Sequence, residues 1–137
     1  MQNRKIRLVM AAAAVALLAG PAGTSADEFT KQELARWEQQ FQGVVKEGRA
    51  LWTSAELGTN GVACAQCHPN AANTHPETYP KFQKQLGRVA ALREMINWCI
   101  QQPLEGKPLA LDSKDMVALE AYVAHERRGV ALAPGKH

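Results

Sequence analysis

One short run of residues has the spacing to attach a prosthetic group, Cys64-Ala65-Gln66-Cys67-His68. Two cysteines separated by two residues can form thioether bonds to the vinyl groups of a haem, and a histidine directly after the second cysteine can bind the iron from the proximal side. The motif therefore predicts one covalent haem c, held through Cys64 and Cys67, with His68 as the proximal iron ligand.

Two other chemistries use similar residues. A zinc site needs four ligands in a tetrahedron, and the neighbouring Cys67 and His68 would have difficulty turning toward one ion. A redox-active dithiol is expected at the start of a helix that follows a strand, and no strand pattern precedes Cys64. The motif also lies behind an export signal, which suits haem attachment better than either alternative.

The first 26 residues predict a secretory signal peptide. Three basic residues near the start precede an apolar run, Leu8 to Ala19, that is short for a bilayer span, and Thr24-Ser25-Ala26 offers small residues to a signal peptidase. Cleavage would leave residues 27–137 as one exported monohaem cytochrome c domain. We expect this domain to be periplasmic and to have no stable membrane insertion.

The charge balance excludes some partners. The net charge of +3 comes from basic residues within positions 1–26, and without them 13 basic residues face 13 acidic ones. A nucleic-acid partner would need a concentrated basic patch, so none is expected. Local charges can still guide redox partner proteins.

Three segments have helical patterns. Thr30-Lys31-Gln32-Glu33 is a capping box that predicts a helix from Lys31, and Gly48 would let a second helix approach closely. Apolar residues spaced three or four apart predict a first helix carrying Leu34, Trp37, Phe41, Val44 and Val45, a second from Leu86 to Ile100, and a third carrying Met116, Leu119, Tyr122 and Val123. Asp112 or Ser113 would cap the third helix and Gly129 would end it.

Strand alternation is not evident, so the expected fold is all-α. We expect three main helices, of which the first and last cross, with long loops around the haem. Gly48-Arg49-Ala50-Leu51-Trp52 resembles the N-terminal helix of a class I cytochrome c, and this resemblance implies a class I cytochrome c fold. Leu51 and Trp52 would cover the haem side or the core. His75, in a proline-rich loop from residue 69 to 80, is expected to be solvated, as is His125 near the end of the last helix.

The distal iron ligand decides the chemistry, because a thioether raises the reduction potential and a thiolate lowers it. Met95, Cys99 and Met116 are the candidates, and the core-like position of Met116 favours packing. Met95 and Cys99 lie four residues apart and so share one helical face. Cys99 is left over once the haem takes two cysteines, and it could bridge two chains, be buried and inert, or act as a ligand.

Several short motifs follow the haem site in a characteristic order: Tyr79-Pro80-Lys81-Phe82, Gly87-Arg88-Val89, Met95-Ile96-Asn97-Trp98-Cys99, Gly106-Lys107-Pro108-Leu109 and Leu119-Glu120-Ala121-Tyr122. From the haem motif to about Arg128 the chain resembles the haem domain of thiosulfate dehydrogenases and SoxA-type sulfur-oxidation cytochromes. This resemblance implies that Cys99 is the distal ligand and the place of thiosulfate chemistry. We therefore favour Cys99 over Met95.

The chain also departs from that family. Its members usually carry an arginine at the position of Met95, and they use a second haem in another domain or subunit, whereas this chain has one haem motif. If the chain acts on a sulfur anion, Arg88, Arg93 and Lys107 are the candidates to recruit it, because they lie near the expected pocket in the sequence.

These observations give two main hypotheses. The first is a periplasmic monohaem cytochrome that carries single electrons and is linked to oxidation of inorganic sulfur compounds, without an enzymatic activity of its own. The alternative is a thiosulfate-processing enzyme or enzyme subunit, resembling thiosulfate dehydrogenase, with Cys99 as the catalytic residue. Either would need redox partner proteins, such as a second haem subunit. A sensor of gaseous ligands would need an open distal side, which nothing in the sequence favours.

Overall fold

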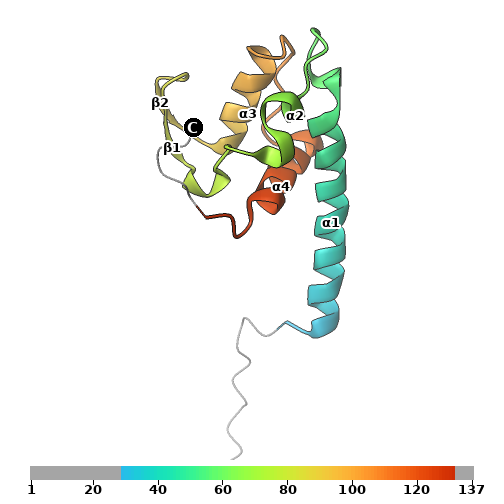
Figure 1. Cartoon of the computed structure of the whole chain (residues 1–137). Coiled ribbons are helices and arrows are strands. Elements are labelled where there is room, and N and C mark those ends of the chain that lie inside the picture. The colour runs from blue at the N-terminus through green and yellow to red at the C-terminus, as the bar shows by residue number, and fades with distance from the viewer. Residues whose placement is uncertain (1–28, 132–137) are drawn as a thin grey trace, which may run out of the picture.

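The computed structural model describes residues 29–131, so the signal peptide expected at residues 1–26 lies outside the described part. Four helices and a small antiparallel sheet form the domain (Figure 1): α1 (Lys31–Thr53), α2 (Cys64–Cys67), β1 (Lys81–Gln83), β2 (Arg88–Ala90), α3 (Leu92–Gln101) and α4 (Lys114–Arg127). Single 3-10 turns occur in the loops at Ala55–Leu57, Pro69–Ala71 and Pro76–Thr78. The fold is mostly helical, as predicted.

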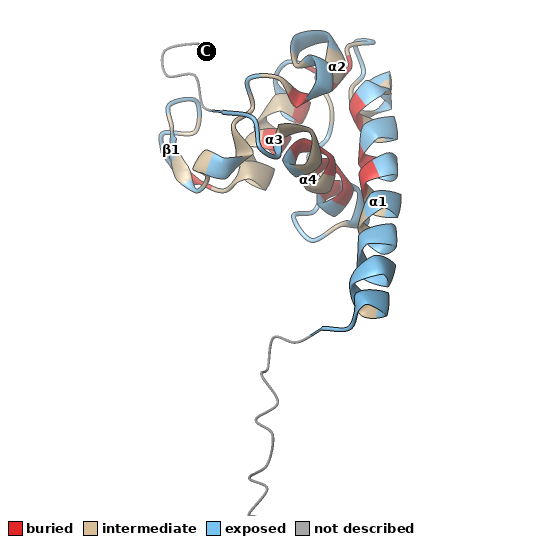
Figure 2. Cartoon of the chain, turned by 60° about the horizontal axis from the view of Figure 1, so that its bottom comes forward, coloured by how far each residue is buried: buried red, intermediate tan, exposed pale blue. Residues whose placement is uncertain are grey.

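Helix α1 begins at the predicted capping box. The Glu33 amide donates to Thr30 Oγ1 at 3.2 Å, and the Thr30 amide donates to the Glu33 carboxylate at 2.9 Å. The helix then continues without a break to Thr53. Its first turns extend past the body of the domain (Figure 2), where Leu34 is 50% and Trp37 is 39% exposed. The spacing of Leu34, Trp37, Phe41, Val44 and Val45 predicts one apolar stripe against the core, and this prediction is wrong for Leu34 and Trp37.

The predicted crossing of the first and last helices is confirmed, and it occurs at Gly48. A Cβ atom at this position would lie 1.9 Å from the carbonyl oxygen of Ala118 on α4. Beside the crossing, Trp52 packs against Tyr122 with ring centroids 5.7 Å apart. The predicted apolar face of α4 is fully buried, with its four members 0 to 1% exposed: Met116, Leu119, Tyr122 and Val123.

Replacement of Gly48 by alanine is expected to destabilise the domain by about 1–3 kcal/mol, because the helices must move apart to relieve the overlap. Gly43→Ala is the matched control on the same helix. A Cβ at Gly43 meets no atom within 4 Å, and alanine should stabilise the helix by up to about 1 kcal/mol. Chemical denaturation of the haem-loaded protein measures both changes. Equal effects of the two substitutions would contradict the close helix contact.

The region before α3 differs from the prediction. Leu86 and Val89 were expected to begin a helix, but residues 81–90 form a β-hairpin in which Lys81 pairs with Ala90 and Gln83 with Arg88. Gly87, at φ +66°, a conformation that favours glycine, is the last residue of the turn between β1 and β2, and its amide donates to the Gln83 carbonyl oxygen at 2.8 Å. Val89 is 62% exposed, so its helix-like spacing from Leu92 does not reflect a shared buried face.

Helix α3 therefore begins only at Leu92, where the Glu94 carboxylate accepts a hydrogen bond from the Ala91 amide at 2.7 Å. Its buried Asn97 fixes the following loop. The Asn97 amide group donates to the Leu109 carbonyl oxygen, and its side-chain oxygen accepts from the Leu109 amide, both at 2.8 Å. These bonds hold α3 at a set distance from the loop that leads into α4.

Of the two cap candidates for α4, Ser113 is the one that the structure shows, with its hydroxyl accepting from the Met116 amide at 3.2 Å. Gly129, at φ +72°, follows the end of the helix, as predicted. Among the helices of residues 29–131, none combines the length and apolar character required to cross a membrane.

Candidate haem site

A cavity of about 730 Å³ lies between α2, the loop after it, the hairpin and α3. This volume is within the range of roughly 300–1,000 Å³ that is common for cofactor sites. Its surface is mainly apolar, and the predicted haem ligands Cys64, Cys67, His68, Met95 and Cys99 all contribute to it.

The histidine on its floor has a defined tautomer. His68 Nδ1 lies 2.8 Å from the Ala72 carbonyl oxygen, and because a carbonyl can only accept, Nδ1 carries the proton. The Nε2 atom is then left with a free lone pair, which is the form of histidine that binds a metal. Trp52 also fixes this residue, since its indole nitrogen donates to the His68 carbonyl oxygen at 3.0 Å.

The single turn of α2 places the two cysteines beside this histidine. The turn begins where the Ala63 amide donates to the Gln66 side chain at 2.9 Å, and it closes where the His68 amide donates to the Cys64 carbonyl oxygen at 2.9 Å. Cys64 is buried, which raises the pKa of its thiol to about 11, whereas Cys67 is exposed at the cavity rim. Neither forms a disulfide in the structure.

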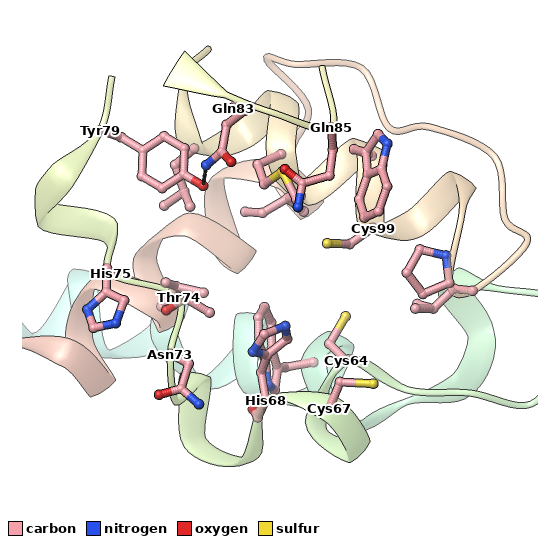
Figure 3. A pocket seen from close by; sticks show the side chains of 18 of the residues that line it. Cys64, Cys67, His68, Asn73, Thr74, His75, Tyr79, Gln83, Gln85 and Cys99 are labelled. Atoms are coloured by element: carbon pink, nitrogen blue, oxygen red, sulfur yellow. Dashed lines mark hydrogen bonds between the residues drawn. The ribbon is translucent and has the colours of Figure 1, made fainter. Parts of the chain in front are cut away.

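Cys99 points into the cavity from α3, on the side opposite His68 (Figure 3). Burial raises the pKa of its thiol to about 11, and the nearby thiols of Cys64 and Cys67 add to the effect. The protein surroundings alone therefore keep Cys99 neutral at pH 7, and a bound metal cation is what would deprotonate it. Met95 also lines the cavity, while Met116 is fully buried in the helix core and does not.

His75 and His125 were both expected to be solvated, and the structure shows that both are partly buried. The His75 side chain is only 15% exposed, lies 3.4 Å from the Glu77 carboxylate and lines the cavity. His125 is half-buried beside Phe41, with ring centroids 6.3 Å apart, and lies away from the cavity. Tertiary structure explains why both histidines are partly buried: the loop of residues 69–80 folds toward the cavity, and the end of α4 packs against α1.

The three cations proposed to recruit an anion do not line the cavity. Arg88 pairs with Glu94 and Arg93 with Glu120, each at 2.7 Å, and Lys107 is exposed. The cavity is instead lined by Lys81, a basic residue that was not among these three candidates. Alternation of side chains in the hairpin is the signal that would have revealed it.

Both alternatives to haem lack support in the described part of the chain. No group of three or more His, Cys, Asp or Glu side chains within residues 29–131 is arranged to hold a metal ion. The strands found in these residues come after Cys67 and not before Cys64, unlike the arrangement around a redox-active dithiol.

The donor set fits a haem c. Two thiols lie on one side of a mainly apolar cavity, a histidine with a free Nε2 lies on its floor, and a sulfur-bearing helix lies opposite. Together with the helical fold, this arrangement defines a cytochrome c domain.

Comparison with known proteins gives the family. Residues 47–132, more than half of the chain, match the family described as SoxA/TsdA, cytochrome c domain. The chain therefore belongs to this family, as the resemblance of its motifs indicated.

The individual relatives are longer proteins, and the chain matches only a part of each. The L-cysteine S-thiosulfotransferase subunit SoxA of Rhodovulum sulfidophilum is 30% identical over 110 residues, which are 78% of this chain and 38% of that protein. The thiosulfate dehydrogenase of Psychrobacter arcticus is 34% identical over 100 residues, 64% of this chain and 31% of that protein. The chain thus spans about a third of these relatives.

The fold also matches a solved structure. The crystal structure of SoxXA from P. pantotrophus superimposes with a TM-score of 0.62 at 22% identity, covering 74% of this chain and 40% of that one. At this identity the match shows a shared fold.

Proposed function

We propose that the cavity holds one haem c, attached through Cys64 and Cys67, with His68 Nε2 as the proximal iron ligand and Cys99 as the distal ligand. The observation that carries this proposal is the 2.8 Å hydrogen bond from His68 Nδ1 to the Ala72 carbonyl oxygen, which leaves Nε2 free in a cavity that three cysteines line. A haem bound here would accept and release single electrons.

We propose further that the domain takes part in thiosulfate oxidation and that Cys99 is its reactive sulfur. The names of the relatives support this: some are thiosulfate dehydrogenases, and others are SoxA subunits of an L-cysteine S-thiosulfotransferase. They favour the thiosulfate-processing alternative over a simple electron carrier. Cys99 is well placed for the role, because it faces the cavity from a rigid helix.

The proposal includes a redox partner. Joining two thiosulfate ions through an S–S bond releases two electrons, whereas a single haem takes up one at a time. A second haem protein in the same exported compartment would remove these electrons. The given sequence contains one Cys-x-x-Cys-His motif, which provides one haem for this transfer.

Thiosulfate-dependent reduction of the ferric protein tests the proposed function. Mixing the haem-loaded protein with thiosulfate and following the visible absorbance should show reduction, and the rate should fall at least tenfold in Cys99→Ser. Met116→Leu is the control, because Met116 lies outside the cavity and a volume-conserving change there is tolerated. Equal rates in the wild type and Cys99→Ser would exclude a role for this thiol.

The electron-carrier hypothesis remains the second candidate, since the chain contains one haem motif and no second one. It predicts fast electron exchange with a partner haem protein and no response to thiosulfate in either the wild type or Cys99→Ser. Stopped-flow measurements with and without thiosulfate therefore separate the two functions.

A further inference from the structure

The β-hairpin forms the cavity wall on the same side as Cys99. Side chains of a strand point alternately to its two faces. On β1 this alternation turns Lys81 and Gln83 toward the cavity, while Phe82 between them is 64% exposed. Tyr79 and Gln85 line the same cavity, so every second residue from 79 to 85 contributes to the wall.

The wall carries an uncompensated positive charge. The cavity-lining residues within the described part of the chain include no Asp or Glu, and Lys81 is the one Lys or Arg among them. None of the ion pairs found within residues 29–131 involves Lys81. Its ammonium nitrogen lies 4.6 Å from the centroid of the Tyr79 ring, a cation–π contact that holds the charge beside the cavity.

The neighbours of Lys81 add hydrogen-bond donors. The Gln83 side-chain amide donates to the Tyr79 hydroxyl oxygen, so the hydroxyl hydrogen of Tyr79 is free to donate elsewhere. Figure 3 shows Tyr79 and Gln83 on the Cys99 side of the cavity. An ammonium and a phenol hydroxyl on one wall suit a compact oxyanion, which accepts several charge-assisted hydrogen bonds.

We propose that Lys81 and Tyr79, with Gln83 orienting the Tyr79 hydroxyl, form an anion-binding wall that brings the sulfonate end of thiosulfate toward Cys99. This inference rests on the proposed function and names the residues that recruit its substrate. A haem propionate is the other anion that Lys81 could pair with, and the experiment separates the two.

Calorimetric titration of thiosulfate into the ferrous, haem-loaded protein at low salt tests the wall, because ferrous haem cannot be reduced by thiosulfate and the heat then reports binding alone. Lys81→Gln should raise the Kd about tenfold, equivalent to about 1.4 kcal/mol and within the contribution of a hydrogen bond to a charged group. Lys81→Arg should bind close to the wild-type value. Lys84→Gln is the matched control, because Lys84 is an exposed residue of the same hairpin that does not line the cavity, and its Kd should not change.

Each other outcome has a definite meaning. If the wild type binds no thiosulfate, the proposed sulfur chemistry fails and the wall fails with it. If Lys81→Gln binds thiosulfate as tightly as the wild type, the wall is wrong and the proposed function stands. A changed reduction potential with an unchanged Kd also overturns the wall, since it assigns Lys81 to a haem propionate.

Discussion

Replacement of Cys64 and Cys67 together by serine is expected to abolish covalent haem attachment completely. Serine hydroxyls do not add to the haem vinyl groups, so neither thioether bond can form. Denaturing electrophoresis followed by haem staining should show a strong band for the wild type and none for the double variant. A haem band that survives the double substitution would rule out attachment through this motif.

The same variant is expected to lose much of its tertiary structure. The cavity of about 730 Å³ is lined by α2, the loop after it, the hairpin and α3 in a domain of little more than 100 described residues, and a group that binds only the folded state stabilises it. Near-ultraviolet circular dichroism measures this loss. The single variant Cys67→Ser is an informative control, since it should retain one thioether bond and a weaker haem stain.

Replacement of Cys99 by alanine is expected to change the iron spectrum and raise the reduction potential. A thiolate stabilises the ferric state, so its removal leaves either an open position or ligation by Met95, which lines the same cavity. Absorption and electron paramagnetic resonance spectra of the ferric protein should change from a low-spin thiolate form to a high-spin or thioether-ligated form.

Met95→Leu is the matched control for that experiment, because it removes the competing sulfur one helical turn away and keeps the side-chain volume. It should leave the thiolate spectrum unchanged. If Met95→Leu changes the spectrum and Cys99→Ala does not, Met95 is the distal ligand. If both variants keep the parent spectrum, neither sulfur binds the iron.

The features predicted from sequence are those decided by local chemistry. The Thr30 capping box, the cap at Ser113 and the stop at Gly129 depend on residues within one helical turn. Gly48 was recognised because a missing side chain permits close helix contact whatever the partner. Cys64, Cys67 and His68 lie within one turn and so reach the cavity together, and Cys99 contributes to the same cavity from helix α3.

The features that were missed depend on tertiary structure. The hairpin was hidden because Leu86, Val89 and Leu92 have helical spacing by coincidence, and its strands are only three residues long. Exposure of Leu34 and Trp37 could not be predicted, since α1 is longer than the body against which it packs. Lys81 and His75 enter the cavity because distant segments fold around it. Alternation along the hairpin indicates the side on which Lys81 lies only once the hairpin itself is known.

The most direct test of this account is the intact mass and visible spectrum of the protein produced by an exporting host with a working cytochrome maturation system. The account predicts a coloured protein cleaved after Ala26, whose mass exceeds that of residues 27–137 by one haem that denaturation does not release. A colourless product, or one that carries zinc at the same cysteines, would contradict it.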